Sequence, residues 1–148
     1  MPINNKQRIF YSARISHWPK RQKRPMLLSL FPYLPKHTKI GNKDQALEYA
    51  KKLQEKGAQN VIISMGSKGA VLLDENGYSY KINALNTKDA INTVGAGDSM
   101  VAGFLAGHEM FNNYEKTLQM GVAAATATTN SIFLATKEKI EENLKNFK

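Results

Sequence analysis

Residues 92–107, which read NTVGAGDSMVAGFLAG, constrain the fold of this chain more than any other segment. Gly95 and Gly97 stand just before one acidic residue, Asp98, and mostly small or apolar residues follow. Glycine lets a backbone adopt positive φ and lets its amides approach a ligand closely. The pattern after the run predicts a helix over residues 98–111, and the first amides of a helix have no partner within it. With the helix dipole, these amides favour a site for a phosphate or another anion.

Asp98 has two interpretations on residue chemistry alone. Its carboxylate could cap its own helix, which is a common structural role. It could instead project into the anion site and take a proton from a hydroxyl that then attacks a bound phosphorus atom. The small residues Gly95, Ala96 and Gly97 shift the balance toward an anion site. The segment is neither a Walker loop nor a GxGxxG loop, and neither motif occurs elsewhere in the chain.

Composition indicates one modest domain. The chain has 148 residues, of which 42% are apolar, which is enough for a core. No window approaches a membrane span and there is no cysteine, so we expect a soluble, cytoplasmic protein without disulfides. His17, His37 and His108 are scattered and lack paired carboxylates, so no protein-held metal site is expected.

The net charge of +9 belongs to the first third of the chain. Residues 1–43 hold ten of the 21 Lys and Arg and no acid, whereas residues 44–148 hold the other eleven against all 12 acids. We therefore place a boundary there, between a basic, proline-rich segment of doubtful order (1–43) and a regular domain (44–148). The acid-free composition of this segment is compatible with a transit peptide, or with a nucleic-acid arm that has Phe10, Tyr11 and Trp18 as stacking groups. The prolines and the missing periodicity favour a poorly ordered segment, and neither a nucleic acid nor a membrane is the expected partner.

From residue 44 onward the pattern becomes regular. It predicts helices over 44–56, 98–111, 114–130 and 137–147, and strands over 60–65, 70–73 and 78–82, with a further short strand within 26–31. Strands covered by helices indicate an α/β or α+β layer. The large apolar residues of the later helices are expected in the core: Phe104, Leu105, Met110, Phe111, Leu118 and Met120.

Several motifs of residues 44–148 resemble those of the ribokinase-like (PfkB) carbohydrate kinases. They are NTVGAGDSMVAGFLAG, KGAQNVIISMGSKGAVLL and AAATATTN. The resemblance implies an α/β fold, namely the carboxy-terminal half of a ribokinase-like three-layer α/β/α fold without its amino-terminal half and lid. It is closest to the phosphosugar branch, the 1-phosphofructokinases and tagatose-6-phosphate kinases. The implied reaction is the ATP-dependent conversion of fructose 1-phosphate to fructose 1,6-bisphosphate with Mg²⁺, and tagatose 6-phosphate is the alternative substrate.

The same resemblance implies roles by position. Asp98 matches the catalytic base, and Gly95, Ala96 and Gly97 match the anion hole for the transferring phosphoryl group. Asn130 lies where the family approaches adenine. The implied ATP-binding turn consists of Ser64, Gly66, Ser67, Lys68 and Gly69, although GSKG read without the resemblance is an ordinary hairpin turn.

Other family elements are missing from the sequence. No Gly-Gly-Lys-Gly-Asn stretch occurs, and the Asn-x-x-Glu element that organises Mg²⁺ through water is absent, since Gln45 follows Asn42 three places later. One hypothesis is that residues 1–43 come from a frame-shifted or internally started kinase gene. We expect marginal stability and little or no phosphoryl transfer by the chain alone. Its partners would be a phosphosugar and ATP, with a homodimer or a complementing amino-terminal half as the protein partner.

Overall fold

The computed structural model describes residues 27–29, 40–56, 58–85 and 90–147. Phe10, Tyr11 and Trp18 of the basic segment lie outside these ranges. The division of the chain at residue 43, and the three interpretations of the segment before it, therefore stay predictions.

Four strands form one mixed sheet in the order β1-β2-β3-β4. β1 (Leu27–Ser29) is parallel to β2 (Asn60–Ser64), and the remaining pairs, β2 with β3 (Ala70–Leu73) and β3 with β4 (Ser79–Ile82), are antiparallel. The two central strands read NVIIS and AVLL and are buried almost throughout. Such continuous apolar runs are typical of strands that are covered on both faces.

The first covered face of the sheet packs against α1 (Lys43–Glu55). Alternate strand residues point to this side. The strand register pairs Val61 with Leu73, and both side chains lie in the core beneath α1. Asn42 fixes the start of the helix, because its Oδ1 accepts a hydrogen bond from the Gln45 amide at 2.9 Å. The Gln45 side chain in turn accepts from the Gly41 amide at 2.7 Å. These two hydrogen bonds fix the backbone at the first turn of α1.

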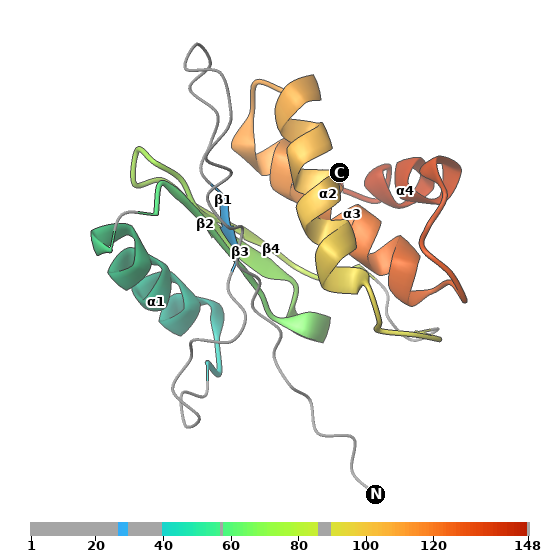
Figure 1. Cartoon of the computed structure of the whole chain (residues 1–148), viewed down its shortest axis with the longest axis horizontal. Helices are drawn as coiled ribbons and strands as arrows, with labels where there is room; N and C mark the ends of the chain where they lie inside the picture. Colours follow the sequence, from blue (N-terminus) through green and yellow to red (C-terminus); the bar gives the residue numbers. More distant parts are fainter. Residues whose placement is uncertain (1–26, 30–39, 57, 86–89, 148) are drawn as a thin grey trace, which may run out of the picture.

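The second face packs against α2 (Ala96–Met110) and α3 (Tyr114–Thr129), with Phe104 fully buried between them and the sheet. The two helices are in close contact through glycine. A Cβ added to Gly103 would lie 2.7 Å from the Ala124 Cβ. α4 (Lys137–Leu144) packs on α3, where the Asn143 side-chain amide donates to the Ala123 carbonyl at 3.3 Å. Figure 1 shows the resulting layers, with α1 on one side of the sheet and the other helices on the opposite side.

The predicted fold class is confirmed, and all the predicted elements are present, β3 with the predicted ends and most others with ends shifted by a few residues. α2 begins at Ala96 instead of residue 98, and α4 ends at Leu144 instead of residue 147. The turn between β2 and β3 is a short 3₁₀ helix, η1 (Gly66–Lys68), instead of a simple hairpin turn. The short strand expected within 26–31 is β1.

The predicted core was partly wrong. Phe104 and Leu118 are fully buried, but Leu105 is 45% exposed and Met110 is 66% exposed. Both lie on the outward side of α2, whereas its inward side is occupied by Gly103, Phe104 and Gly107. Phe111 and Met120 are half-buried.

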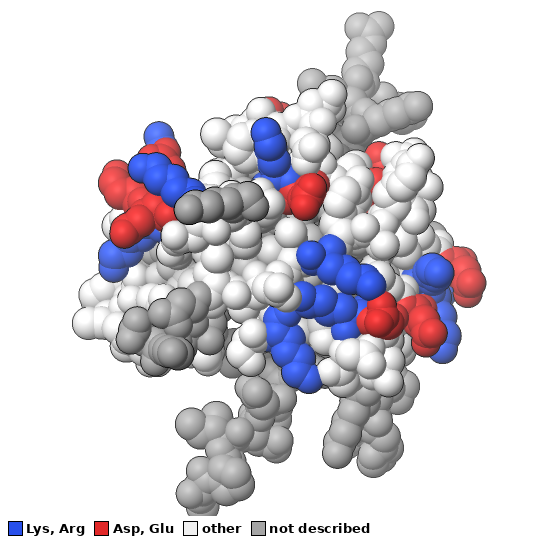
Figure 2. Space-filling model, turned by 180° about the vertical axis from the view of Figure 1, so that it is seen from behind, with Lys and Arg blue, Asp and Glu red and all other residues white. Residues whose placement is uncertain are grey.

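The face of the molecule shown in Figure 2 carries described side chains of both charge signs. On the face shown in Figure 2, lysine and acidic side chains stand next to one another in separate groups. This agrees with the near balance of charge in residues 44–148. Within the part of the chain that the structure describes, no helix has the length and apolarity needed to cross a membrane.

Candidate functional site at the start of α2

The approach to α2 is shaped by Asn92 and Gly95. The Asn92 Oδ1 accepts a hydrogen bond from the Val94 amide at 2.9 Å, which turns the chain two residues before the helix. Gly95 then adopts φ 80°, a left-handed conformation that disfavours any residue with a side chain. The regular ladder starts with the Ser99 amide, which donates to the Gly95 carbonyl at 2.8 Å. The amides of Gly97 and Asp98 therefore precede the ladder and point out of the start of the helix.

Asp98 is the third residue of α2, and its side chain is exposed. Gly95 occupies the N-cap position, and no side chain bonds to the cap. Among the described residues, Asp98 has no side-chain hydrogen bond and no ion pair. The capping interpretation of Asp98 is therefore not the one that the structure favours, and its carboxylate is available to a ligand in front of the helix.

The end of α3 holds this helix start in place. The Thr129 carbonyl accepts from the amides of Ile91 at 2.8 Å and Asn92 at 3.0 Å. From the preceding residue, the buried Thr128 hydroxyl donates to the Ser99 Oγ at 2.8 Å. The glycine loop is thus fixed by hydrogen bonds to a neighbouring helix, so its amides keep their direction without a ligand.

The predicted ATP-binding turn lies at the end of β2. Ser64 is half-buried and belongs to the face of the sheet that α2 and α3 cover, because it alternates with Val61 and Ile63 on the α1 side. Gly66 and Ser67 are exposed. Gly69 is buried at φ 91°, and a Cβ there would lie 2.0 Å from the Ile82 carbonyl oxygen, so only glycine fits.

Lys68 has a structural contact that the sequence did not indicate. Its Nζ donates to the Gly41 carbonyl at 2.6 Å and so links the turn to the chain just before α1. The Lys68 ammonium group is thus directed to the α1 side of the turn. Figure 1 shows the β2–β3 turn and the start of α2 at the same end of the molecule.

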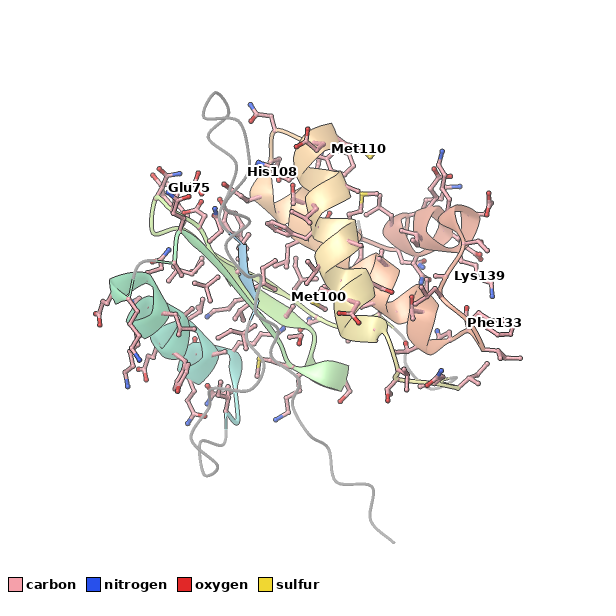
Figure 3. The ribbon with its side chains drawn as sticks, in the orientation of Figure 1. Glu75, Met100, His108, Met110, Phe133 and Lys139 are labelled. Carbon is pink, nitrogen blue, oxygen red and sulfur yellow. The ribbon has the colours of Figure 1, made fainter. Side chains whose placement is uncertain are left out.

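Asn130 follows α3 as its C-cap and lines an open pocket of about 410 Å³. Apart from Lys139, its other lining residues carry no charge: Ile91, Ser131, Ile132, Phe133, Leu134 and Thr136. Phe133 is 82% exposed, and Figure 3 shows it at the outer end of this loop, near Lys139. Leu134 connects the pocket to the glycine loop, because a Cβ on Gly95 would lie 2.9 Å from the Leu134 Cδ2.

The described residues contain no group of three His, Cys, Asp or Glu side chains that could hold a metal ion. Asp98 is the acidic side chain at the glycine loop, and one carboxylate alone makes a poor Mg²⁺ site. The donors at the site are backbone amides, which suit phosphate oxygens. The site therefore fits an anion better than a protein-bound cation.

Sequence reasoning missed Asn92, Ser99 and Thr128, which position the loop. Thr128 could have been noticed, because its hydroxyl lies in a helix segment that is otherwise largely alanine. A polar side chain on such a buried segment needs a partner. Nothing in the sequence, however, identifies Ser99 as that partner.

A second polar cluster lies at the other end of the molecule, where Figure 3 shows Glu75 and His108. The Tyr114 hydroxyl donates to the Glu75 Oε2 at 2.6 Å, and the His108 ring stacks on Tyr114 with centroids 5.7 Å apart. Burial alone would raise the pKa of Glu75, but hydrogen bonds from Tyr114 and Asn60 hold it below its ordinary value. Burial, reinforced by the bond to Glu75, raises the pKa of Tyr114. This cluster joins the β3–β4 hairpin to α2 and α3.

The layers of the molecule are those of the ribokinase-like fold. The structure superposes on Arabidopsis thaliana ribokinase with a TM-score of 0.64 at 21% identity, over 71% of this chain and 35% of that one. A Staphylococcus aureus protein described as a candidate phosphofructokinase gives a TM-score of 0.67 at 39% identity, over 73% and 35% of the two chains. The described fold is therefore that of part of a ribokinase-like domain.

Sequence comparison identifies the family. Residues 34–138 match the pfkB family of carbohydrate kinases, and the chain belongs to that family. The 1-phosphofructokinase of Bacillus subtilis (strain 168) is 42% identical over 107 residues, which are 72% of this chain and 35% of the relative. The chain thus spans about a third of the length of the relative that it matches.

Proposed function

We propose that this chain is the nucleotide-binding and proton-accepting part of an ATP-dependent phosphosugar kinase. Its substrate would be fructose 1-phosphate, converted to fructose 1,6-bisphosphate, with tagatose 6-phosphate as the alternative. The preference for fructose 1-phosphate is supported by the relative from Bacillus subtilis that is named 1-phosphofructokinase and is 42% identical over the matched residues. The observation that carries the proposal is the exposed, unbonded Asp98 beside the free amides at the start of α2.

The proposed chemistry needs few groups from this chain. Asp98 would accept the proton of the sugar hydroxyl, whose oxygen then attacks the γ-phosphorus as ADP leaves. The amides of Gly97 and Asp98, after the left-handed Gly95, would donate hydrogen bonds to the oxygens of the transferring phosphoryl group. Phosphoryl transfer depends mostly on positioning and charge stabilisation, so a base beside an amide nest supplies the main local requirement.

The remaining predicted residues would hold the nucleotide. Ser64, Gly66, Ser67, Lys68 and Gly69 form the proposed phosphate-binding turn, in which the backbone and the Ser64 hydroxyl would contribute more than the Lys68 amine. The pocket beside Asn130 would accept the adenine ring of ATP. Mg²⁺ would enter with the nucleotide, because the described residues provide no metal site of their own.

Asp98→Asn tests the assigned base. The variant removes the proton acceptor while the backbone amides stay, so we expect unchanged ATP affinity in a titration and loss of phosphoryl transfer by about 100-fold or more. Glu109→Gln, an exposed acid on the same helix, is the matched control and should behave like the wild type. Turnover is measured with ATP and fructose 1-phosphate in the presence of a co-expressed amino-terminal kinase half.

One result would contradict the proposed base, and another would contradict the expectation that the chain is inactive alone. Retained turnover in Asp98→Asn would remove Asp98 from the role of base. Fructose 1-phosphate turnover by the 148-residue chain alone would contradict the expectation that this chain needs a second half.

A further inference from the structure

The Thr128 hydroxyl is a buried polar group that two separate segments of the chain share. Thr128 is the penultimate residue of α3 and is 2% exposed. A hydroxyl has one proton to donate and two lone pairs with which to accept. The Thr128 Oγ1 donates to the Ser99 Oγ at 2.8 Å and accepts from the Ala135 amide at 3.3 Å. This side chain therefore bonds to the first turn of α2 and to the loop of residues 130–136, which we call the pocket loop.

The two bonded segments belong to different parts of the candidate site. Ser99 directly follows Asp98, whose side chain is exposed at the start of α2. Ala135 directly follows Leu134, which lines the open pocket of about 410 Å³. The two parts also lie close together at Gly95, where an added Cβ would be 2.9 Å from the Leu134 Cδ2. One buried hydroxyl thus connects the segment of the proposed base to the segment of the proposed adenine pocket.

Each part also has hydrogen bonds that do not involve the Thr128 hydroxyl. The Thr129 carbonyl accepts two amide hydrogen bonds from the segment that leads into α2. The Ser131 hydroxyl donates to the Ala127 carbonyl at 2.8 Å and holds the start of the pocket loop. These bonds remain when the Thr128 hydroxyl is removed. Its loss should therefore affect the position of one part relative to the other more than the shape of either part.

We propose that Thr128 is a positioning residue that holds the glycine loop and the pocket loop at the spacing required by a nucleoside triphosphate that reaches both. This inference rests on the proposed function, which puts the phosphates at the glycine loop and the adenine in the pocket. When two moieties of one ligand bind at two sites, the second moiety binds intramolecularly, and the gain in affinity depends on the geometry of the sites. Loss of the hydroxyl therefore weakens a ligand that reaches both parts and leaves a ligand of the glycine loop alone unaffected.

Thr128→Val tests this role, because valine keeps the shape of the side chain and lacks the hydroxyl. The 148-residue chain is titrated calorimetrically with ATP and with inorganic triphosphate, which can occupy only the glycine loop. We expect the ATP affinity of Thr128→Val to fall about ten-fold and its triphosphate affinity to stay within about two-fold of the wild type. Thr128→Ser retains the hydroxyl and should restore ATP binding.

A second variant removes the same hydrogen bond from its other end. Ser99→Ala deletes the acceptor at a half-buried helical position, where alanine is compatible with the fold. It should show the same selective loss of ATP affinity, and it decides the question if Thr128→Val does not fold.

Thr117→Val is the matched control. Thr117 is a buried threonine near the opposite end of α3, and its hydroxyl donates to the Asn113 carbonyl at 2.8 Å. This variant should bind ATP as the wild type does, whatever its unfolding temperature. A general loss of stability is thereby distinguished from a change in the spacing of the two loops.

The outcomes separate this inference from the proposed function. Wild-type ATP affinity in both Thr128→Val and Ser99→Ala would overturn the inference alone. Parallel losses for ATP and triphosphate would also overturn it, because they would indicate a purely structural role. If the wild type binds triphosphate as tightly as ATP, the glycine loop remains a phosphate site but the proposed spacing has no effect. A wild type that binds neither compound would overturn the proposed function and the inference with it.

Discussion

Gly95 determines the direction of the chain at the candidate site, since its φ of 80° turns the backbone into α2. Gly95→Ala would force a side chain into the left-handed region at a cost of about 1–2 kcal/mol. We expect a lower unfolding temperature together with weaker ATP binding, measured by thermal unfolding and by calorimetric titration.

Gly77→Ala is the matched control for this substitution. Gly77 has φ 84° in the β3–β4 hairpin, and no atom lies within 4 Å of an added Cβ. It should show a similar loss of stability with unchanged ATP affinity. Equal ATP affinity in Gly95→Ala and the wild type would mean that the loop does not hold the phosphates.

The hydrogen bond between Tyr114 and Glu75 should make the free energy of unfolding depend on pH. The folded state depresses the pKa of Glu75, so its contribution is present above the unfolded pKa and is lost as the pH falls through the folded pKa. The pKa of Tyr114 is raised, so its contribution is complete below the ordinary tyrosine pKa and declines as the pH rises above about 10.

Tyr114→Phe removes the ionisable hydroxyl and, with it, the largest of the interactions that lower the pKa of Glu75. We expect a flatter plot of unfolding free energy against pH at its acid and its alkaline end, measured by urea denaturation over a pH series. An unchanged slope at both ends would show that the bond contributes nothing to folding.

Among the described helices and strands, α2 and α3 are in the most extensive contact, and Gly103 lies at their closest approach. An alanine in a helix is ordinarily favoured over glycine by about 1 kcal/mol. At Gly103, however, the added Cβ would lie 2.7 Å from the Ala124 Cβ and 2.8 Å from a backbone oxygen. We expect Gly103→Ala to destabilise the protein by about 1–3 kcal/mol, as overpacked cores do.

Gly107→Ala provides a graded comparison. Its nearest contacts are 3.1 and 3.2 Å, so a small movement of the helices would accommodate the methyl group. Urea denaturation should show a smaller loss for Gly107→Ala than for Gly103→Ala. The reverse order would show that these distances do not control the packing.

Most elements could be predicted from sequence, because the apolar runs of β2 and β3, the alternating β4 and the amphipathic α1 are local patterns. The start of α2 could not, because it depends on the φ of Gly95 and on the Asn92 turn. The role of Asp98 as a base stays a prediction, and only the backbone geometry shows that Gly95, and not Asp98, occupies the N-cap position. Leu105 was placed in the core because an apolar residue in an apolar helix normally lies there, and the sequence does not show which helix face lacks a partner.

At the scale of the whole molecule, one sheet separates two cores. Phe104 belongs to the core beneath α2 and α3, and Leu53 belongs to the core beneath α1. Because β2 and β3 contribute to both cores, we expect the described domain to unfold in one transition. Phe104→Ala should cost about 3–5 kcal/mol and Leu53→Ala about 2–5 kcal/mol.

Chemical denaturation followed by circular dichroism checks this expectation. Each variant should move the midpoint of a single transition. A biphasic curve in which one variant shifts only one phase would show that the two sides of the sheet fold independently.

The glycine contact between α2 and α3 has a consequence for molecular recognition. Because α2 and α3 are in close contact at Gly103, we expect the distance between the Gly95 loop and the pocket beside Asn130 to be the same with and without a ligand. Such a preorganised site would select ligands by their length and would lose little conformational entropy on binding. ATP analogues with one phosphate fewer or one more should therefore bind less tightly, because they cannot reach the glycine loop and the pocket in the same way.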